Sequence, residues 1–467
     1  MDFKQPGSEP GLPKKINWLN IVLAGLAPGL ALLCYLLFLT GDYFLPVKSP
    51  LWLAGAVLLL VVVIAYKIGR SRGFTLAGLR GWLVANGPVL ILVVALLGGG
   101  LLRYQALKTR PITSASPDPA AVQAFATEAR DIINQSNWQP KSYEQPPLYL
   151  YGGAAVVELI FFQQASGGKI NSPEQVANQD ILDYLTYVNL LLGLVTIVVV
   201  YAAGSRWWRS GLAGASAAGL SGLAWLAYQA TPNPAPQLLA AALGALAFYA
   251  MTFSEPGRRA PLFWAGLLAG LATGAAYGSG LILAPLLWLA AFQTASPTGK
   301  EKRLGRNGVT LGGWLLGWTL ACPGWILGAN RFVEGLAAIK PAPEAALNGY
   351  FKQFFGYDLG LLAVVFLAFA YAVVRRTTWG RFWPLLAFPV LYFIVLNLTG
   401  PLNVTRLALV VPWLALAVAG PFAETAVWLQ ERLPLRFRQA TWSGAALTFL
   451  GLALVVAVSI LGRRFFA

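Results

Sequence analysis

The sequence predicts an all-α polytopic membrane protein with about 13 transmembrane helices. Of its 467 residues, 57% are hydrophobic and only 11% are charged, and the mean hydropathy is +0.63. A soluble domain of this composition would lack the polar residues that its surface needs. The apolar runs are continuous rather than alternating, and this favours spanning helices over strands.

Thirteen apolar runs have about the length of a spanning helix. They cover roughly residues 17–39, 51–66, 82–102, 184–203, 210–230, 236–253, 261–276, 278–294, 308–328, 359–374, 383–398, 404–423 and 441–461. The first run is too long for the apolar part of a cleavable signal and has no small-residue cleavage site, so we expect it to remain as a helix.

The charges predict a cell-membrane protein whose N-terminus is cytoplasmic. This orientation places 21 of the 34 Lys and Arg residues on the cytoplasmic side, with only 6 of the 18 Asp and Glu residues, as the positive-inside rule expects. The basic residues form short clusters between apolar runs, so the net charge of +16 indicates contact with the lipid bilayer rather than nucleic acid. Arg463 and Arg464 break the pattern, which leaves the side of the C-terminus open.

The longest polar interval, residues 103–182, is predicted to be a single outer loop. Its apolar segment 147–164 is expected to lie at the membrane surface or to re-enter, because a crossing there would leave Arg206 and Arg209 on the outer side. We divide the chain into a cytoplasmic tail with an extra helical hairpin (1–81), a main transmembrane module (82–423), and an amphipathic segment with the last helix (424–467).

The absence of histidine restricts the chemistry that the chain can perform. Without it the chain has no imidazole base and no usual zinc site. The two cysteines, Cys34 and Cys322, both lie in apolar runs and have no metal-ligand spacing. A general base is therefore expected to be a carboxylate, with Lys or Tyr as the less favoured alternatives, and we predict no metal-ligating residues.

Several stretches, taken in order, resemble the GT-C superfamily, and more narrowly the branch of protein mannosyltransferases and aminoarabinose transferases. The first lies in the loop: Ala129-Arg130-Asp131-Ile132-Ile133, Trp138, Pro140 and Glu144-Gln145-Pro146-Pro147-Leu148-Tyr149. Later ones are Tyr187-Val188-Asn189, Gly266-Leu267-Leu268-Ala269-Gly270, Pro323-Gly324-Trp325 with Asn330 and Gly335, and Thr405-Arg406-Leu407 with Pro412. Together they extend from about Trp82 to Pro421.

The resemblance implies a GT-C-like fold and a membrane glycosyltransferase. Such an enzyme transfers a sugar from a polyprenyl-phosphate donor to an acceptor on the outer face. A carboxylate would deprotonate the acceptor, and cationic groups, or a divalent cation, would stabilise the leaving phosphate. Asp118 is the candidate base, with Glu128 and Asp131 as substitutes. The candidates for substrate binding are Arg406, Lys352, Arg331, Gln145 and Tyr149.

Two other functions remain open. Ala120 or Ala121 stands where the family has an acidic pair, so the scaffold could have lost its chemistry and act as a lipid-binding or assembly subunit. A transporter is the least favoured function, because the sequence shows no internal repeat. The sequence identifies neither the sugar nor the acceptor.

Overall fold

A computed structural model of the chain describes residues 76–109, 119–135, 139–141, 143, 146–232, 235–255, 258–292, 300–338, 347–398, 404–432 and 443–466. All of these residues belong to one compact unit, Leu51–Ala467. The predicted helices at 17–39 and 51–66 lie outside the described residues, as do Asp118 and Gln145.

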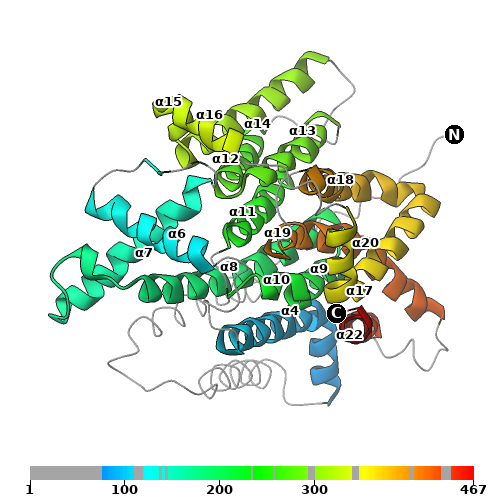
Figure 1. Ribbon diagram of the computed structural model, residues 1–467. Helices are drawn as coiled ribbons and strands as arrows, with labels where there is room; N and C mark the ends of the chain where they lie inside the picture. The colour runs from blue at the N-terminus through cyan, green and yellow to red at the C-terminus, as the bar shows by residue number, and fades with distance from the viewer. Residues whose placement is uncertain are drawn as a thin grey trace. The chain divides into compact units, whose positions relative to one another are not determined.

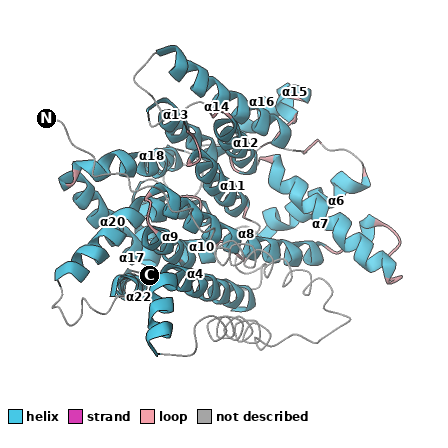
Figure 2. Ribbon diagram, turned by 180° about the vertical axis from the view of Figure 1, so that it is seen from behind, coloured by secondary structure: helices cyan, strands magenta, loops and turns pink. Residues whose placement is uncertain are grey.

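Every regular element in the described part of the chain is a helix (Figures 1 and 2). The first half contains α4 (Leu76–Thr109), α6 (Pro119–Asn134), α7 (Pro147–Ser166), η1 (Pro173–Gln175), α8 (Asn178–Trp207), α9 (Gly211–Leu223), α10 (Trp225–Gln229), α11 (Pro236–Met251), α12 (Ala260–Ala275), η2 (Tyr277–Ile282) and α13 (Leu283–Phe292). The second half contains α14 (Lys300–Ala321), α15 (Gly324–Leu327), α16 (Ala329–Ala338), α17 (Leu347–Val374), α18 (Arg376–Leu398), α19 (Val404–Leu407), α20 (Val411–Arg432) and α22 (Ser443–Phe466).

Six of the described helices are long and apolar enough to cross a membrane. These six segments are Asn86–Leu107, Asn178–Trp207, Phe354–Val374, Thr378–Leu396, Val411–Arg432 and Gly444–Leu461. Three shorter apolar helical segments are Pro236–Met251, Ala260–Ala275 and Tyr277–Phe292. The chain is thus an all-α polytopic membrane protein, as predicted, while the total of 13 crossings stays a prediction.

Some predicted helix boundaries differ from those observed. The predicted helix 210–230 is interrupted at Ala224, whose φ of −62° and ψ of 125° are extended. The predicted helix 404–423 divides into α19 and α20, and the second begins beside Pro412, which has no N–H to donate to the preceding turn. α4 continues to Thr109, past the predicted start of the loop at residue 103.

α20 lies at the centre of the packed helices, and α22 lies at the edge. In the most apolar stretch of each helix, 72% of the residues are buried in α20 but only 17% in α22. In α20, Trp413 is fully buried and its ring lies 5.5 Å from Phe248 and 5.2 Å from Phe388. A helix that is apolar on all sides is typical of this central position, because it meets neither water nor headgroups.

α12 and α14 approach each other most closely through glycines. A Cβ atom on Gly266 or Gly270 of α12 would overlap backbone atoms of α14, and one on Gly313 or Gly317 would overlap backbone atoms of α12. Small residues that recur every four positions allow two helix backbones to approach in a membrane, where packing rather than hydrophobicity holds helices together.

The predicted outer loop contributes a helical hairpin to the fold. α6 and α7 lie beside each other in both views, away from α17, α18 and α20 (Figures 1 and 2). α7 covers the segment that we expect to lie at the membrane surface, and it is not among the helices that qualify as candidate spans. Its location at the surface stays a prediction.

Candidate functional site

The face of α6 that packs on α7 is built from small and apolar residues at helical spacing. Ala126, Ala129 and Ile132 recur every three residues and are 0 to 3% exposed. Opposite them, a Cβ on Gly153 of α7 would meet Ala129 Cβ and the Phe125 ring at 3.2 Å. The close approach of the two helices leaves the polar face of α6, which carries Glu128 and Asp131, turned away from α7.

Both of these candidate catalytic carboxylates contact Lys141. The Lys141 backbone N–H donates to Glu128 Oε1 at 2.7 Å, and its ammonium group forms an ion pair with Asp131 Oδ2 at 2.5 Å. The hydrogen bond to Asp131 is the main cause that raises the pKa of Lys141 above its ordinary value. The two acidic side chains therefore hold the chain that follows α6, and neither projects freely toward a substrate.

Tyr143 anchors this same segment against η2, α15 and α16. It is 1% exposed, and its backbone carbonyl accepts a hydrogen bond from the Tyr277 hydroxyl of η2 at 3.0 Å. A Cβ on Gly324 would overlap the Tyr143 ring, and one on Gly335 would lie 2.8 Å from Tyr143 Cβ. Burial raises the pKa of Tyr143, and the positive charge of Arg331 on α16 opposes this shift. Arg331 itself is exposed.

An aromatic cluster surrounds Tyr143. It consists of Tyr143, Tyr277, Trp318, Trp325 and Phe332, with the buried Cys322. The Trp318 and Trp325 rings are stacked with centroids 5.2 Å apart and an interplanar angle of 2°. The cluster thus brings together the loop stretch and the Pro323-Gly324-Trp325…Gly335 stretch, which lie far apart in the sequence.

Tyr149 has a buried position. It is 4% exposed, its hydroxyl donates to Asn189 Oδ1 of α8 at 3.1 Å, and its ring lies 5.5 Å from Phe125. The Asn189 amide in turn donates to the Thr231 carbonyl after α10 at 3.4 Å. Tyr149 therefore joins α7 to α8, and the structure does not place its hydroxyl on an open surface.

Arg406 is half-buried on the short helix α19. Its charge acts on Tyr392 of α18, which is 3% exposed. Gly278 of η2 is in turn so close to Tyr392 that an added Cβ would lie 2.5 Å from the ring. Because Tyr277 of η2 contacts Tyr143, η2 connects the surroundings of Arg406 with the aromatic cluster.

The other candidates are less closely connected. Lys352 is exposed on α17, two residues after the buried Tyr350. Asp118 and Gln145 lie outside the described residues, so their relation to Arg406 stays a prediction. The described contacts thus connect Arg406, Arg331, Glu128 and Asp131 indirectly, through η2, Tyr143 and Lys141.

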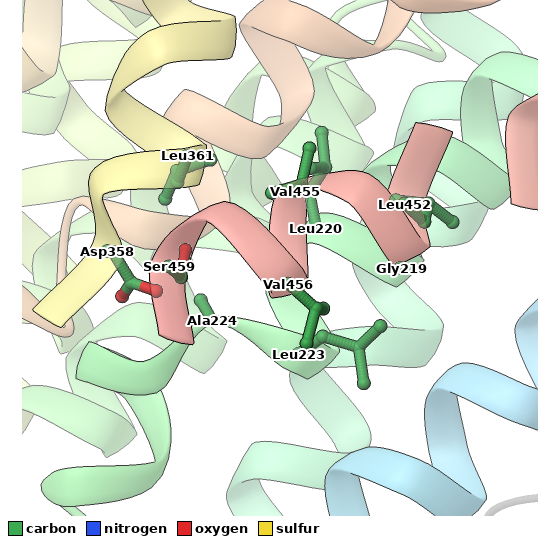
Figure 3. A pocket seen from close by; sticks show the side chains of 10 residues that line it. All are labelled: Gly219, Leu220, Leu223, Ala224, Asp358, Leu361, Leu452, Val455, Val456 and Ser459. Carbon is green, nitrogen blue, oxygen red and sulfur yellow. The ribbon is translucent and has the colours of Figure 1, made fainter. Parts of the chain in front are cut away.

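Sequence reasoning missed two charged residues inside candidate spans. Arg103 of α4 and Asp358 of α17 are each 2% exposed. Arg103 was expected to begin the loop, and Asp358 directly precedes the predicted helix 359–374. Asp358 borders a cavity of about 10 Å³ between α9, α17 and α22 (Figure 3), a space for one water molecule at most. The cavity is too small for a substrate. A charge directly beside a long apolar run was the available signal.

Metal-ligand clusters are not found in the described ranges. No group of three or more Cys, Asp or Glu residues there is arranged to hold a metal ion.

No family model matches the chain, and no curated protein matches it. Among solved structures it is similar to ArnT from Cupriavidus metallidurans bound to undecaprenyl phosphate, with 15% identity and a TM-score of 0.44 over 82% of this chain and 77% of that one. It is also similar to the oligosaccharyltransferase AglB from Archaeoglobus fulgidus in complex with an inhibitory peptide and a dolichol-phosphate, with 13% identity and a TM-score of 0.45 over 82% of this chain and 56% of that one. These likenesses are distant, and the function proposed below rests on this chain's own residues.

Proposed function

We propose that the chain is a membrane glycosyltransferase that moves a sugar from a polyprenyl-phosphate donor to an acceptor at the outer face. The observation that carries this proposal is the meeting of three separate stretches around η2. Tyr143 from the first loop accepts a hydrogen bond from Tyr277 of η2, Gly324 and Gly335 pack against Tyr143, and Tyr392, which lies near Arg406, adjoins Gly278 of η2. Gly324, Gly335 and Arg406 belong to stretches on which the sequence resemblance to GT-C enzymes depends, and Tyr143 directly precedes another.

Arg406 is the proposed ligand of the donor phosphate. A guanidinium group presents two parallel N–H donors to phosphate oxygens and stays charged at any physiological pH. Arg406 is also the half-buried one of the three proposed cations, whereas Lys352 and Arg331 are exposed. A half-buried cation interacts more strongly with a phosphate than an exposed one, because less water screens the pair. Lys352, Arg331 and Gln145 are assigned secondary contacts with the donor.

Asp118 is the proposed general base. Glu128 and Asp131 both contact Lys141, so either would have to give up that contact before it could accept a proton from the acceptor. Asp118 immediately precedes α6 in the sequence and is the remaining one of the three candidate bases. Tyr149, buried against Asn189, would support the wall of the site by holding α7.

Transfer measured in membranes tests this function. Membranes that contain the wild type or the Asp118→Asn variant are supplied with radiolabelled polyprenyl-phosphate sugars. We expect transfer by the wild type and at least about a 100-fold loss in Asp118→Asn. The matched control is Glu174→Gln, which alters an exposed carboxylate of the same loop. Undiminished transfer in Asp118→Asn would remove that residue from the mechanism.

The second candidate function is a scaffold that binds the lipid without transferring the sugar. It is favoured by one observation: both described candidate bases contact Lys141, and alanines stand at positions 120 and 121. Wild-type protein that binds polyprenyl phosphate and transfers no sugar from any donor would support it over the enzyme.

A further inference from the structure

α9 and α10 form one helix interrupted at Ala224, and the interruption lies between two buried charges of opposite sign. α9 ends at Leu223 and α10 begins at Trp225. Arg103 reaches the end of α9 from α4, and Asp358 reaches the start of α10 from α17 (Figure 3 shows Asp358 beside Ala224). Both charged side chains are 2% exposed.

On the α9 side, the Arg103 guanidinium binds carbonyl groups. Its Nη1 donates to the Gly222 carbonyl at 3.1 Å and to the Gly99 carbonyl at 3.0 Å. Gly222 is in the last turn of α9, where carbonyls have no intrahelical partner and the helix dipole is negative. A Cβ on Gly193 of α8 would lie 2.5 Å from Arg103 Nε, so glycine at this position makes room for the cation.

On the α10 side, the Asp358 carboxylate binds the first two N–H groups. Trp225 N–H donates to Oδ1 at 2.8 Å and Leu226 N–H donates to Oδ2 at 2.7 Å. Asp358 departs from helical geometry to do so, with φ −135° and ψ 48° inside α17. Each charge therefore complements the end of a half-helix that an apolar environment would otherwise leave unsatisfied.

α10 then leads directly to the elements that carry candidate site residues. It packs against α19, which carries Arg406. The turn after α10 joins the same region, because Ala230 forms a buried cluster with Ala235, Leu238 and Ala408, the residue that follows α19. On the other side, the Thr231 carbonyl accepts from Asn189, which holds Tyr149 of α7.

We propose that Arg103 and Asp358 are positioning residues for Arg406. By fixing the two ends of the interrupted helix they hold α10 in place, and α10 holds α19 at the level where Arg406 meets the donor phosphate. The role of Arg406 rests on the proposed function, whereas the dependence of α19 on Asp358 does not.

The first test needs neither donor nor activity. Backbone hydrogen exchange is measured on the full-length protein in detergent micelles, for the wild type and for Asp358→Asn, which keeps the size of the side chain and removes the charge. We expect exchange to become at least about tenfold faster in α10 and in residues 404–410, with α6 unchanged. The control is Glu424→Gln, which removes another carboxylate, the acceptor of the Tyr371 hydroxyl at 2.6 Å. Unchanged exchange at 404–410 in Asp358→Asn overturns the proposal.

The second test separates positioning from general stability. We expect Asp358→Asn to raise the KM for the polyprenyl-phosphate donor about tenfold with kcat changed less than about threefold. If Asp358 acts through Arg406, the double variant with Arg406→Ala has the KM of Arg406→Ala alone. If the two substitutions together raise KM by the product of their separate factors, the proposal is contradicted.

A second variant covers the case in which Asp358→Asn does not fold. Arg103→Met removes the charge and the Nη1 donor that contacts both carbonyls, and the same exchange pattern in residues 404–410 is expected. If the wild type shows no transfer while exchange at 404–410 still responds to either variant, the proposed function fails and the positioning of α19 stands. If neither folded variant changes that exchange, the positioning proposal fails even when transfer is observed.

Discussion

The hydroxyl of Tyr149 lies 3.1 Å from Oδ1 of Asn189 and donates a hydrogen bond to it. Both residues are at most 4% exposed, so water does not replace this donor when it is removed. The contact joins the loop hairpin to α8. Removing one oxygen atom, that of the Tyr149 hydroxyl, therefore tests how this contact holds α7.

Tyr149→Phe is expected to lower the free energy of unfolding by about 1 to 3 kcal/mol, because the Asn189 oxygen loses a donor in a buried place. Thermal unfolding in detergent measures the effect. The control is Tyr249→Phe, since Tyr249 is half-buried and packs its ring 5.0 Å from Phe253, a contact that phenylalanine keeps. Equal stability of the two variants would contradict the prediction.

Lys141→Met is expected to accelerate hydrogen exchange in the last turn of α6, because Asp131 loses its ammonium partner while Glu128 keeps only its bond to the backbone N–H. The free-energy effect is below about 1 kcal/mol, since the Lys141 side chain is 63% exposed and water screens the pair. Lys169→Met, at another exposed position, is the control and should leave α6 unchanged.

The same contact predicts a pH dependence. The folded-state pKa of Lys141 is raised above its ordinary 10.5, so the stabilisation is fully present below that value and is lost as the pH rises through the raised pKa. Exchange in α6, corrected for its intrinsic rate, should therefore rise at strongly alkaline pH in the wild type. In Lys141→Met the corrected rate should not depend on pH there, and a rise of equal size would exclude Lys141 as the cause.

Gly324→Ala is expected to reduce stability by about 1 to 3 kcal/mol and to impair transfer, because the new Cβ would overlap the buried Tyr143 ring. Adding Tyr143→Leu removes the ring and should restore part of the lost stability. Gly328→Ala is the control, since its Cβ would have only an ordinary contact with the Gly324 carbonyl at 3.6 Å. Thermal unfolding of the three variants decides the point.

Gly313 and Gly312 are neighbours on α14, and their substitution by alanine is expected to have opposite effects on stability. A Cβ on Gly313 would overlap the Phe263 carbonyl of α12, whereas one on Gly312 meets nothing within 4 Å. The first should destabilise the pair by about 1 to 3 kcal/mol, and the second should gain up to about 1 kcal/mol from helix propensity. If both alanines raise stability, α12 and α14 do not pack as closely as described.

The sequence was sufficient to predict the class of fold because a bilayer requires each apolar segment to satisfy its own backbone hydrogen bonds as a helix. It was not sufficient for the interruption at Ala224, because nothing in Leu223-Ala224-Trp225 breaks a helix. The carboxylate that binds the N–H groups freed there belongs to Asp358, 133 residues after Trp225. The start of the loop was placed too early for a related reason: Arg103 resembles the charged end of a span, but Gly222, 119 residues later, provides its carbonyl partner.

The candidate site was predictable as a set of stretches but not as an arrangement. Pro323-Gly324-Trp325 and the segment around Tyr143 were both selected from the sequence, yet only the packing of the Tyr143 ring on Gly324 shows that they meet. Glu128 and Asp131 were selected as carboxylates suited to catalysis. Their shared partner Lys141 lies 13 residues after Glu128 and 10 after Asp131, and local periodicity does not reveal which lysine a helix will contact.

One carbonyl partner of Arg103 is synthesised long after Arg103 itself. Gly222 follows Arg103 by 119 residues, which the ribosome adds in roughly 6 to 24 s at about 5 to 20 residues per second. Throughout that interval the Gly222 carbonyl, which binds the Arg103 guanidinium group in the finished protein, has not been synthesised. Placing a charge within a membrane helix costs roughly 2.5 to 3.5 kcal/mol. Biogenesis of this protein therefore requires α4 to wait beside water, lipid headgroups or the insertion machinery until α9 arrives.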